Sequence, residues 1–247
     1  MSVSLISVAE RPDLVASASA MGEEIWPAYL ITAALTEYWD DLYLSALAHF
    51  QTLAVDDASG AVVGLGNSVP FWRDPDAPLP NKGWDAVLEL GVTAARQGMP
   101  VNALSALSVA IRPAYRGTGL AERLLGAMKP PAHAAGLTSM VAPVRPTLKS
   151  LYPLQDFATY CGWRRPDGTP FDPWLRTHEA LGATVIGPAM ASMTMTGTIA
   201  QWQDWSGLRF PASGLYAIAG ALAPLEVDLA ADRATYIEPN LWMQHPL

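Results

Sequence analysis

The sequence predicts an α/β fold of the α+β type, in which helices pack on one central sheet, and three observations support this prediction. First, apolar segments with the length of strands alternate with segments of helical periodicity along most of the 247 residues. Second, the strand-like segments 51–55 and 61–69 are joined by residues 56–60 (DDASG), which are typical of a hairpin turn. Third, the apolar strand 104–111 runs through a glycine-containing turn into an amphipathic helix.

The other elements follow from the same periodicities. We expect further strands at 3–8, 140–144, 192–197, 215–219, 225–229 and 235–237, and helices at 21–31, 35–50, 84–97 and 172–181. Pro130 and Pro131 should end or kink the helix that follows the glycine turn, because an interior proline costs about 3 kcal/mol. The Pro- and Asp-rich segment that leads into the helix 84–97 is interpreted as an insertion.

Composition narrows the class of protein. Hydrophobic residues make up 51% and charged residues 15% of the chain, so a sizeable core is expected and disorder is not. A net charge of -8 provides no basic surface for nucleic acid, although it suits a cationic small substrate. Cys161 is the only cysteine, which favours a reducing, cytoplasmic location. The uncharged run 180–203 contains glycine, proline, serine and threonine, so we expect strands and turns there and no membrane partner.

The segment 116–121 (RGTGLA) has the features of an anion-binding turn. It joins a strand to a helix, so the unpaired N–H groups of the first helical turn point outward at the positive end of the helix dipole. The two glycines would let a phosphate approach the backbone. A Walker A string is absent, and a dinucleotide fingerprint fails because Glu122 stands where the third glycine should be. A strand-to-helix turn that binds nothing is the alternative.

Residues 109–121 (VAIRPAYRGTGLA) resemble the acyl-CoA-binding motif of the GNAT (N-acetyltransferase) superfamily. The family pattern Arg/Gln-x-x-Gly-x-Gly/Ala falls on Arg116, Gly119 and Ala121. The resemblance implies that backbone amides of the turn hold the pyrophosphate of acetyl-CoA or another acyl-CoA, while the preceding strand offers its backbone to the pantetheine arm; it implies no metal. The implied cofactor-binding residues are Val109, Ile111, Arg116, Gly117, Thr118, Gly119, Leu120 and Ala121.

The same resemblance implies the architecture and the reaction class. The sheet should be mixed and mostly antiparallel, flanked by helices, and splayed where the coenzyme enters. We expect a single domain over residues 1–247, with a helical insertion at about 71–98 and a β-rich C-terminal extension at about 198–247. The implied activity moves an acetyl or other short acyl group from acyl-CoA to an amine of a small-molecule acceptor. The sequence leaves a homodimer open.

His178 stands where many GNAT enzymes have a tyrosine that protonates the departing thiolate, four residues before the glycine of a Leu-Gly pair. A histidine titrates near pH 6.5 and can act as acid or base around neutrality. Thr147 and His178 also resemble a pair in GNAT-like domains that decarboxylate malonyl-CoA or move acyl groups between thiols. Two further alternatives are a helix histidine that only packs, and a non-catalytic acyl-CoA-binding module.

The general base is not evident in the sequence. In this family it is often a carboxylate on or beside the fourth strand, but residues 102–111 contain none. The candidates are Asp85 and Glu89 in the inserted helix, His178, or a relay of waters. The four histidines show no metal-ligand spacing, so no metal is expected.

Overall fold

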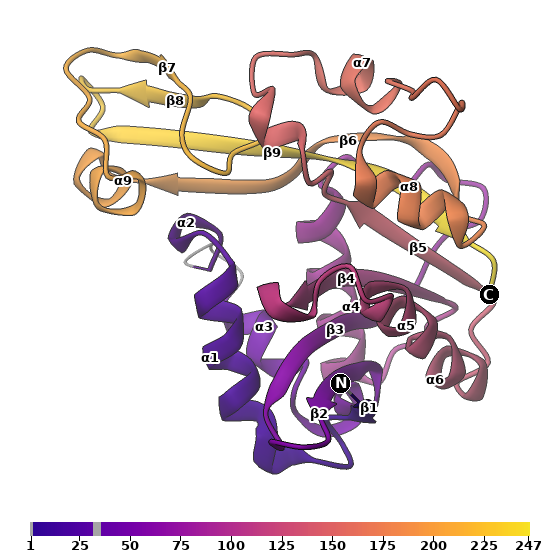
Figure 1. The fold of residues 1–247 in the computed structure, drawn as a ribbon. Helices are drawn as coiled ribbons and strands as arrows, with labels where there is room; N and C mark the ends of the chain where they lie inside the picture. Colours follow the sequence, from indigo (N-terminus) through magenta and orange to yellow (C-terminus); the bar gives the residue numbers. More distant parts are fainter. Residues whose placement is uncertain (1, 32–35) are drawn as a thin grey trace.

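The computed structural model describes residues 2–31 and 36–247. Within these residues nine strands form one sheet in the order β1-β2-β3-β4-β5-β9-β8-β7, with β6 paired to β9 (Figure 1). The strands are β1 (Val3–Ser7), β2 (Gln51–Asp56), β3 (Val62–Phe71), β4 (Ala103–Ile111), β5 (Ser139–Val144), β6 (Thr184–Gly197), β7 (Gly214–Tyr216), β8 (Leu225–Asp228) and β9 (Arg233–His245). Only β4 and β5 pair in parallel among the described strands, so the predicted mixed, mostly antiparallel sheet is confirmed.

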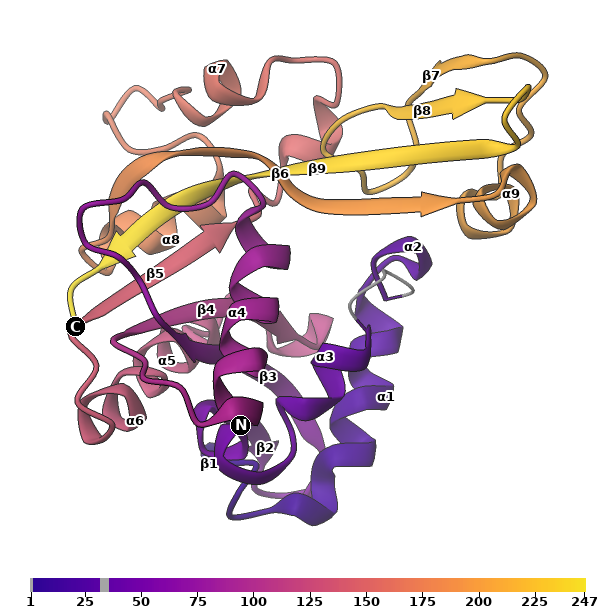
Figure 2. The same ribbon diagram turned by 180° about the vertical axis from the view of Figure 1, so that it is seen from behind.

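Helices cover both faces of the sheet. They are α1 (Val15–Ile25), α2 (Ala28–Ile31), α3 (Thr36–Asp41), α4 (Gly83–Gln97), α5 (Leu120–Ala127), α6 (Lys129–Ala134), α7 (Phe157–Cys161), α8 (Pro173–Ala180) and α9 (Ile199–Ser206). The clusters of buried hydrophobic residues show that α5, α6 and α8 pack on one face of the sheet and that α1 and α4 pack on the other. Helix α4 is visible in Figure 2. No helix within residues 2–31 and 36–247 is long and apolar enough to cross a membrane.

Prolines set the boundaries of two pairs of neighbouring helices. Pro130 and Pro131 occupy the first turn of α6, where a missing N–H is tolerated, and α5 has already ended at Ala127, as predicted. The predicted helix 21–31 is instead two helices. Trp26 is extended before Pro27, because a residue that precedes proline avoids the helical region.

The predicted helix 35–50 is also wrong, as far as the described residues reach. Helix α3 ends at Asp41 and a 3-10 helix, Ser45–Phe50, follows it. The N–H groups of residues 42–44 bond to carbonyls three residues earlier in the chain, which makes a bend here. Because of this bend, both Leu42 and Leu47 are buried in the core. Residue 35 lies outside the described residues.

The last strand is much longer than the predicted strand 235–237. It runs from Arg233 to His245 and lies inside the sheet, between β5 and β8 and against β6. Together β6 and β9 form a long ribbon that carries β7, β8 and α9 beyond the rest of the sheet (Figures 1 and 2). Pro239 is accommodated because the β6–β9 register is interrupted around it. The end of the expected C-terminal extension is therefore an interior strand.

The parallel pair β4–β5 is short. The two strands pair over 103–105 and 139–141 only, and beyond these residues they do not pair with each other. We call residues 106–111 of β4 and 142–144 of β5 the splayed region. In the β3–β4 register Asn67 opposes Ser108 and Ser68 opposes Ala106, so Leu107 is an extra residue, a β-bulge, where the strands begin to part.

Candidate active site

The turn between β4 and α5 has an open surface. Gly117 and Gly119 have φ angles of 73° and 79°, in the left-handed region that favours glycine. A Cβ atom added at either position would meet no atom within 4 Å. A ligand can therefore lie directly against this backbone.

The backbone amides of the turn are unoccupied donors. In the described chain no hydrogen bond engages the N–H groups of residues 117–122, and the first helical bond runs from Arg123 N to Gly119 O at 3.2 Å. These donors lie at the N-terminus of α5, where the helix dipole favours an anion. The turn is thus suited to a pyrophosphate.

Two predicted cofactor residues brace the turn with their side chains. Arg116 Nε donates to the carbonyl of Ile111 at 3.0 Å, and Thr118 Oγ1 donates to the carbonyl of Tyr115 at 2.8 Å. The Arg116 side chain is therefore folded back on β4. Both contacts hold the turn in the shape that exposes its amides.

The other predicted cofactor residues pack beneath the turn. Ile111, Leu120 and Leu124 share one buried cluster on the α5 face, with Val109 and Ala121 at its margin. The backbone at Val109 and Ile111 belongs to the splayed region. The structure thus brings all the predicted cofactor residues together in one strand–turn–helix unit.

His178 lies on α8, on the same face of the sheet as α5. It is 2% exposed, and its Nδ1 is 2.7 Å from Nε2 of His245. Its other ring nitrogen, Nε2, is buried without a hydrogen-bond partner. Trp174 and His178 make an edge-to-face ring contact, with ring centroids 4.5 Å apart. Burial lowers the pKa of His178 to about 3, with a smaller contribution from His245, so the ring is neutral at neutral pH.

The histidine pair lies close to the point where β4 and β5 separate. Leu104 of β4, Met140 of β5 and His245 of β9 are register partners and lie side by side in one row across the three strands. The neighbouring row is the last one in which β4 and β5 still pair. Neighbouring rows are about 3.3 Å apart. Met140 faces the α5 and α8 side, and directly opposed residues share a face, so His245 points to the same side.

The structure does not bring Thr147 and His178 together. Thr147 is exposed, and its hydroxyl lies 3.4 Å from Oδ1 of Asp172, the N-cap of α8. His178 follows six residues later, about 9 Å along the helix axis. No hydrogen bond joins the two side chains in the described chain.

Asp85 occupies the first turn of α4, on the opposite face. Its carboxylate accepts a hydrogen bond from Thr194 N at 3.0 Å. Burial raises the pKa of Asp85 to about 6, with nearby Glu238 and Glu89 contributing in the same direction. The neighbouring Trp84 donates its indole N–H to the carbonyl of the bulged Leu107 at 3.0 Å. The N-terminus of α4 is therefore fixed beside the splayed region.

An ion pair that the sequence did not predict accompanies Asp85. Arg145 directly follows β5, and its Nε is 2.9 Å from Oε1 of the fully buried Glu238 on β9. The other carboxylate oxygen accepts from the hydroxyl of Tyr236 at 2.8 Å. Glu238 and His245 were missed because β9 was predicted as three residues, so nothing indicated that either side chain would reach the site. Glu89 itself is exposed.

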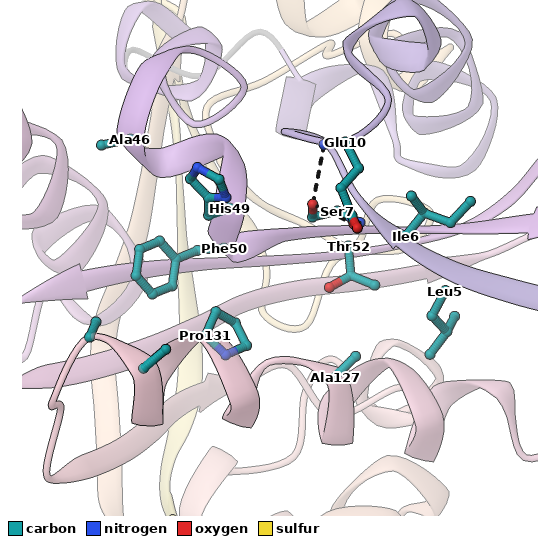
Figure 3. Close-up of a pocket in the computed structure, with 12 residues that line it drawn as sticks. Leu5, Ile6, Ser7, Glu10, Ala46, His49, Phe50, Thr52, Ala127 and Pro131 are labelled. Atoms are coloured by element: carbon teal, nitrogen blue, oxygen red, sulfur yellow. Dashed lines mark hydrogen bonds between the residues drawn. The ribbon is translucent and has the colours of Figure 1, made fainter.

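Two features lie apart from this site. A groove of about 720 Å³ runs between β1, the 3-10 helix Ser45–Phe50 and helices α5 and α6, at the end of α5 away from the turn (Figure 3).

Burial raises the pKa of Cys161 to about 12, so this thiol is a poor nucleophile. Within the described residues no group of three or more His, Cys, Asp or Glu could hold a metal ion.

Comparison with known proteins defines the family. No family model matches the chain. The arginine N-acetyltransferase avaD of Aspergillus versicolor is 33% identical over 273 residues, covering 99% of this chain and 94% of that protein. The fold matches the loading GNATL domain of CurA from Lyngbya majuscula (TM-score 0.65, 16% identity, 99% and 98% of the two chains). It also matches the GphF GNAT-like decarboxylase in complex with isobutyryl-CoA (TM-score 0.57, 17% identity, 99% and 98%).

The chain thus combines a splayed mixed sheet with an open turn that is suited to a pyrophosphate. The chain belongs to the GNAT superfamily of acyl-CoA-dependent N-acetyltransferases. The predicted family, fold class and co-substrate are therefore confirmed.

Proposed function

We propose that the chain transfers an acetyl group from acetyl-CoA to an amino group of arginine or a closely related cationic small molecule. The observation that carries the proposal is the 33% identity with an arginine N-acetyltransferase along 99% of the chain. The carboxylate of Asp85 beside the splayed region supports it, because a cationic acceptor needs negative charge near its binding site.

In this proposal the coenzyme occupies the α5 face. The amides of Gly117 to Ala121 bind the pyrophosphate, and the backbone of β4 at Val109 and Ile111, which does not pair with β5, binds the pantetheine arm. The thioester then lies in the splayed region, where a strand N–H can polarise its carbonyl oxygen.

The acceptor approaches from the α4 face, where Asp85 is half-buried. With a pKa of about 6, Asp85 is ionised at neutral pH and can still take a proton, which suits a general base. Arg145 neutralises Glu238, so the charge of Asp85 remains for the acceptor cation. The neutral amine forms a bond to the thioester carbon, the carbon–sulfur bond breaks, and the thiolate accepts a proton.

A second candidate is decarboxylation of malonyl-CoA, favoured by the fold similarity to the GphF decarboxylase. The separation of Thr147 from His178 counts against it. We also propose a cytoplasmic location, since a single cysteine suits a reducing compartment.

The proposal is tested with purified protein, acetyl-CoA and a panel of amines, by following thiol release and the mass of the product. Arginine and other cationic amines should be acetylated faster than neutral amines of similar size. Preference for neutral amines would contradict the acceptor assignment, and the absence of thiol release with every amine would contradict N-acetyl transfer.

A further inference from the structure

His245 is the hydrogen-bond partner of His178, and the N-acetyl transfer described above gives it no role. The two rings are 2.7 Å apart between His178 Nδ1 and His245 Nε2, and both side chains are almost fully buried. Two buried imidazoles can share one proton in this contact only if one ring donates and the other accepts. The contact therefore allows two arrangements: His178 donates from Nδ1, or His245 donates from Nε2 and the proton of His178 lies on Nε2.

The far nitrogens of the pair face different surroundings. His178 Nε2 is buried and has no hydrogen-bond partner in the described chain. Such an atom costs free energy unless a ligand or water satisfies it. His245 Nδ1 makes no hydrogen bond in the described chain either, but unlike His178 Nε2 it is not a fully buried atom. The pair thus connects a buried point to the protein surface.

The buried point lies beside the path proposed for the coenzyme. His245 is one row from the last paired row of β4 and β5, on the face that carries α5 and α8. Trp174, which contacts His178, and Val109 of the splayed region border the same apolar cluster. A thioester between the strands would therefore place its sulfur near the histidine pair.

The electrostatic surroundings keep both rings neutral. Burial lowers the pKa of His178 to about 3 and that of His245 to about 4, and Lys129 of α6 lowers the latter further. The charged or titratable side chains that act on the pair are thus Lys129 and the two histidines themselves. A lone neutral imidazole is a weak acid, so His178 needs a second group that supplies a proton to Nδ1 as Nε2 loses one.

We propose that His245 is a positioning residue that holds His178 with its N–H on Nε2 and relays a proton to it, so that His178 Nε2 protonates the departing CoA thiolate. This inference rests on the proposed acetyl transfer.

Protons balance in this relay. When the carbon–sulfur bond breaks, the proton on His178 Nε2 moves to sulfur, the proton on His245 Nε2 moves to His178 Nδ1, and water delivers a proton to His245 Nδ1. The amine has meanwhile lost a proton to Asp85 and then to water. The proton taken up by the thiolate is therefore balanced by the one that the amine releases, and the overall reaction takes no net proton from the solvent. After CoA leaves, water returns a proton to His178 Nε2, the proton on His178 Nδ1 moves back to His245 Nε2, and His245 Nδ1 releases its proton to water.

The kinetic test compares His245→Phe with His178→Phe, and uses His133→Phe at an exposed position on α6 as the matched control. The first two variants should each lower kcat by about 10²-fold or more, with the KM for acetyl-CoA little changed, because both interrupt one general-acid path. The control should keep its activity. Full activity of His245→Phe would overturn the relay.

A second measurement separates a relay from mere packing. In His245→Ala, added imidazole should restore activity, whereas pyrrole, a ring of the same size with no second nitrogen, should not. Equal rescue by both rings would show that His245 only fills space and would overturn the proposal.

A third measurement does not require turnover. Nitrogen-15 NMR of labelled histidine should show His178 protonated on Nε2, and CoA should shift this resonance in the wild type. In His245→Phe the tautomer preference should be lost. A resonance insensitive to CoA overturns the relay. A CoA-sensitive resonance with no amine acetylated would support the pair as a thiol contact and contradict the proposed acetyl transfer instead.

Discussion

Replacing Gly119 by valine tests the coenzyme turn in the most controlled way. Gly119 has φ 79°, and a Cβ atom added at this position meets no protein atom within 4 Å. A non-glycine residue in this left-handed conformation costs about 1–2 kcal/mol. Because a chain of this size loses about 2–4 °C of Tm per kcal/mol, the variant should melt about 2–8 °C lower and remain folded. The valine side chain would occupy the open space that the pyrophosphate needs.

Gly168 provides a matched control. Its φ is 80°, a Cβ atom there also meets nothing within 4 Å, and it lies in an exposed turn between α7 and α8. Gly168→Val should therefore lose as much stability as Gly119→Val but keep CoA binding.

The assay is the rise in Tm caused by CoA. A ligand at 100 times its Kd stabilises the folded state by about 2.7 kcal/mol, which corresponds to about 5–11 °C here. The wild type and Gly168→Val should show this rise, and Gly119→Val should not. A normal rise in folded Gly119→Val would place the anion site elsewhere, and its loss in both variants would point to strain instead of a blocked site.

Three further predictions concern the charged and titratable groups. Arg116→Ala should weaken CoA binding less than Gly119→Val, measured by calorimetry, because the Arg116 side chain braces the turn from behind. Asp85→Asn should lower kcat/KM by about 10²–10⁴-fold and remove an acid limb near pH 6 from the pH–rate profile, while Asp204→Asn, at an exposed position of α9, should change neither. An unchanged limb in Asp85→Asn would assign it to another group. The pKa of His178 is about 3 in the folded state, below its unfolded value. The neutral ring therefore makes its full contribution to the free energy of unfolding above pH 6.5, and this contribution is lost as the pH falls toward 3. Urea unfolding at pH 7 and 4.5 should show a smaller loss of unfolding free energy in His178→Phe; an equal loss would contradict a neutral buried ring.

Local signals in the sequence predicted the parts of the site that are local in the fold. The turn 116–121 and its flanking strand and helix are contiguous, so glycine spacing and periodicity were sufficient to locate them. The break between α5 and α6 followed from two prolines. Helix α4, which carries Asp85, matches the predicted helix 84–97 to within one residue.

The parts that were missed depend on pairing between distant segments. The strand β9 contains Pro239 and the buried polar residues Glu238, Asn240 and His245, which interrupt any apolar pattern. It becomes an interior strand only because β5 and β6 pair with it. The partners of Arg145 and His178 are therefore supplied by tertiary structure, and no local pattern could have indicated them.

Transfer of an acetyl group from acetyl-CoA to an amine can be tested by comparing two reactions. The purified enzyme is incubated with acetyl-CoA and arginine in one reaction and with malonyl-CoA alone in another, and the products are identified by mass spectrometry. We expect arginine carrying one acetyl group and free CoA in the first reaction, and unchanged malonyl-CoA in the second. Acetyl-CoA formed from malonyl-CoA, with no acetylated amine in the first reaction, would contradict this expectation.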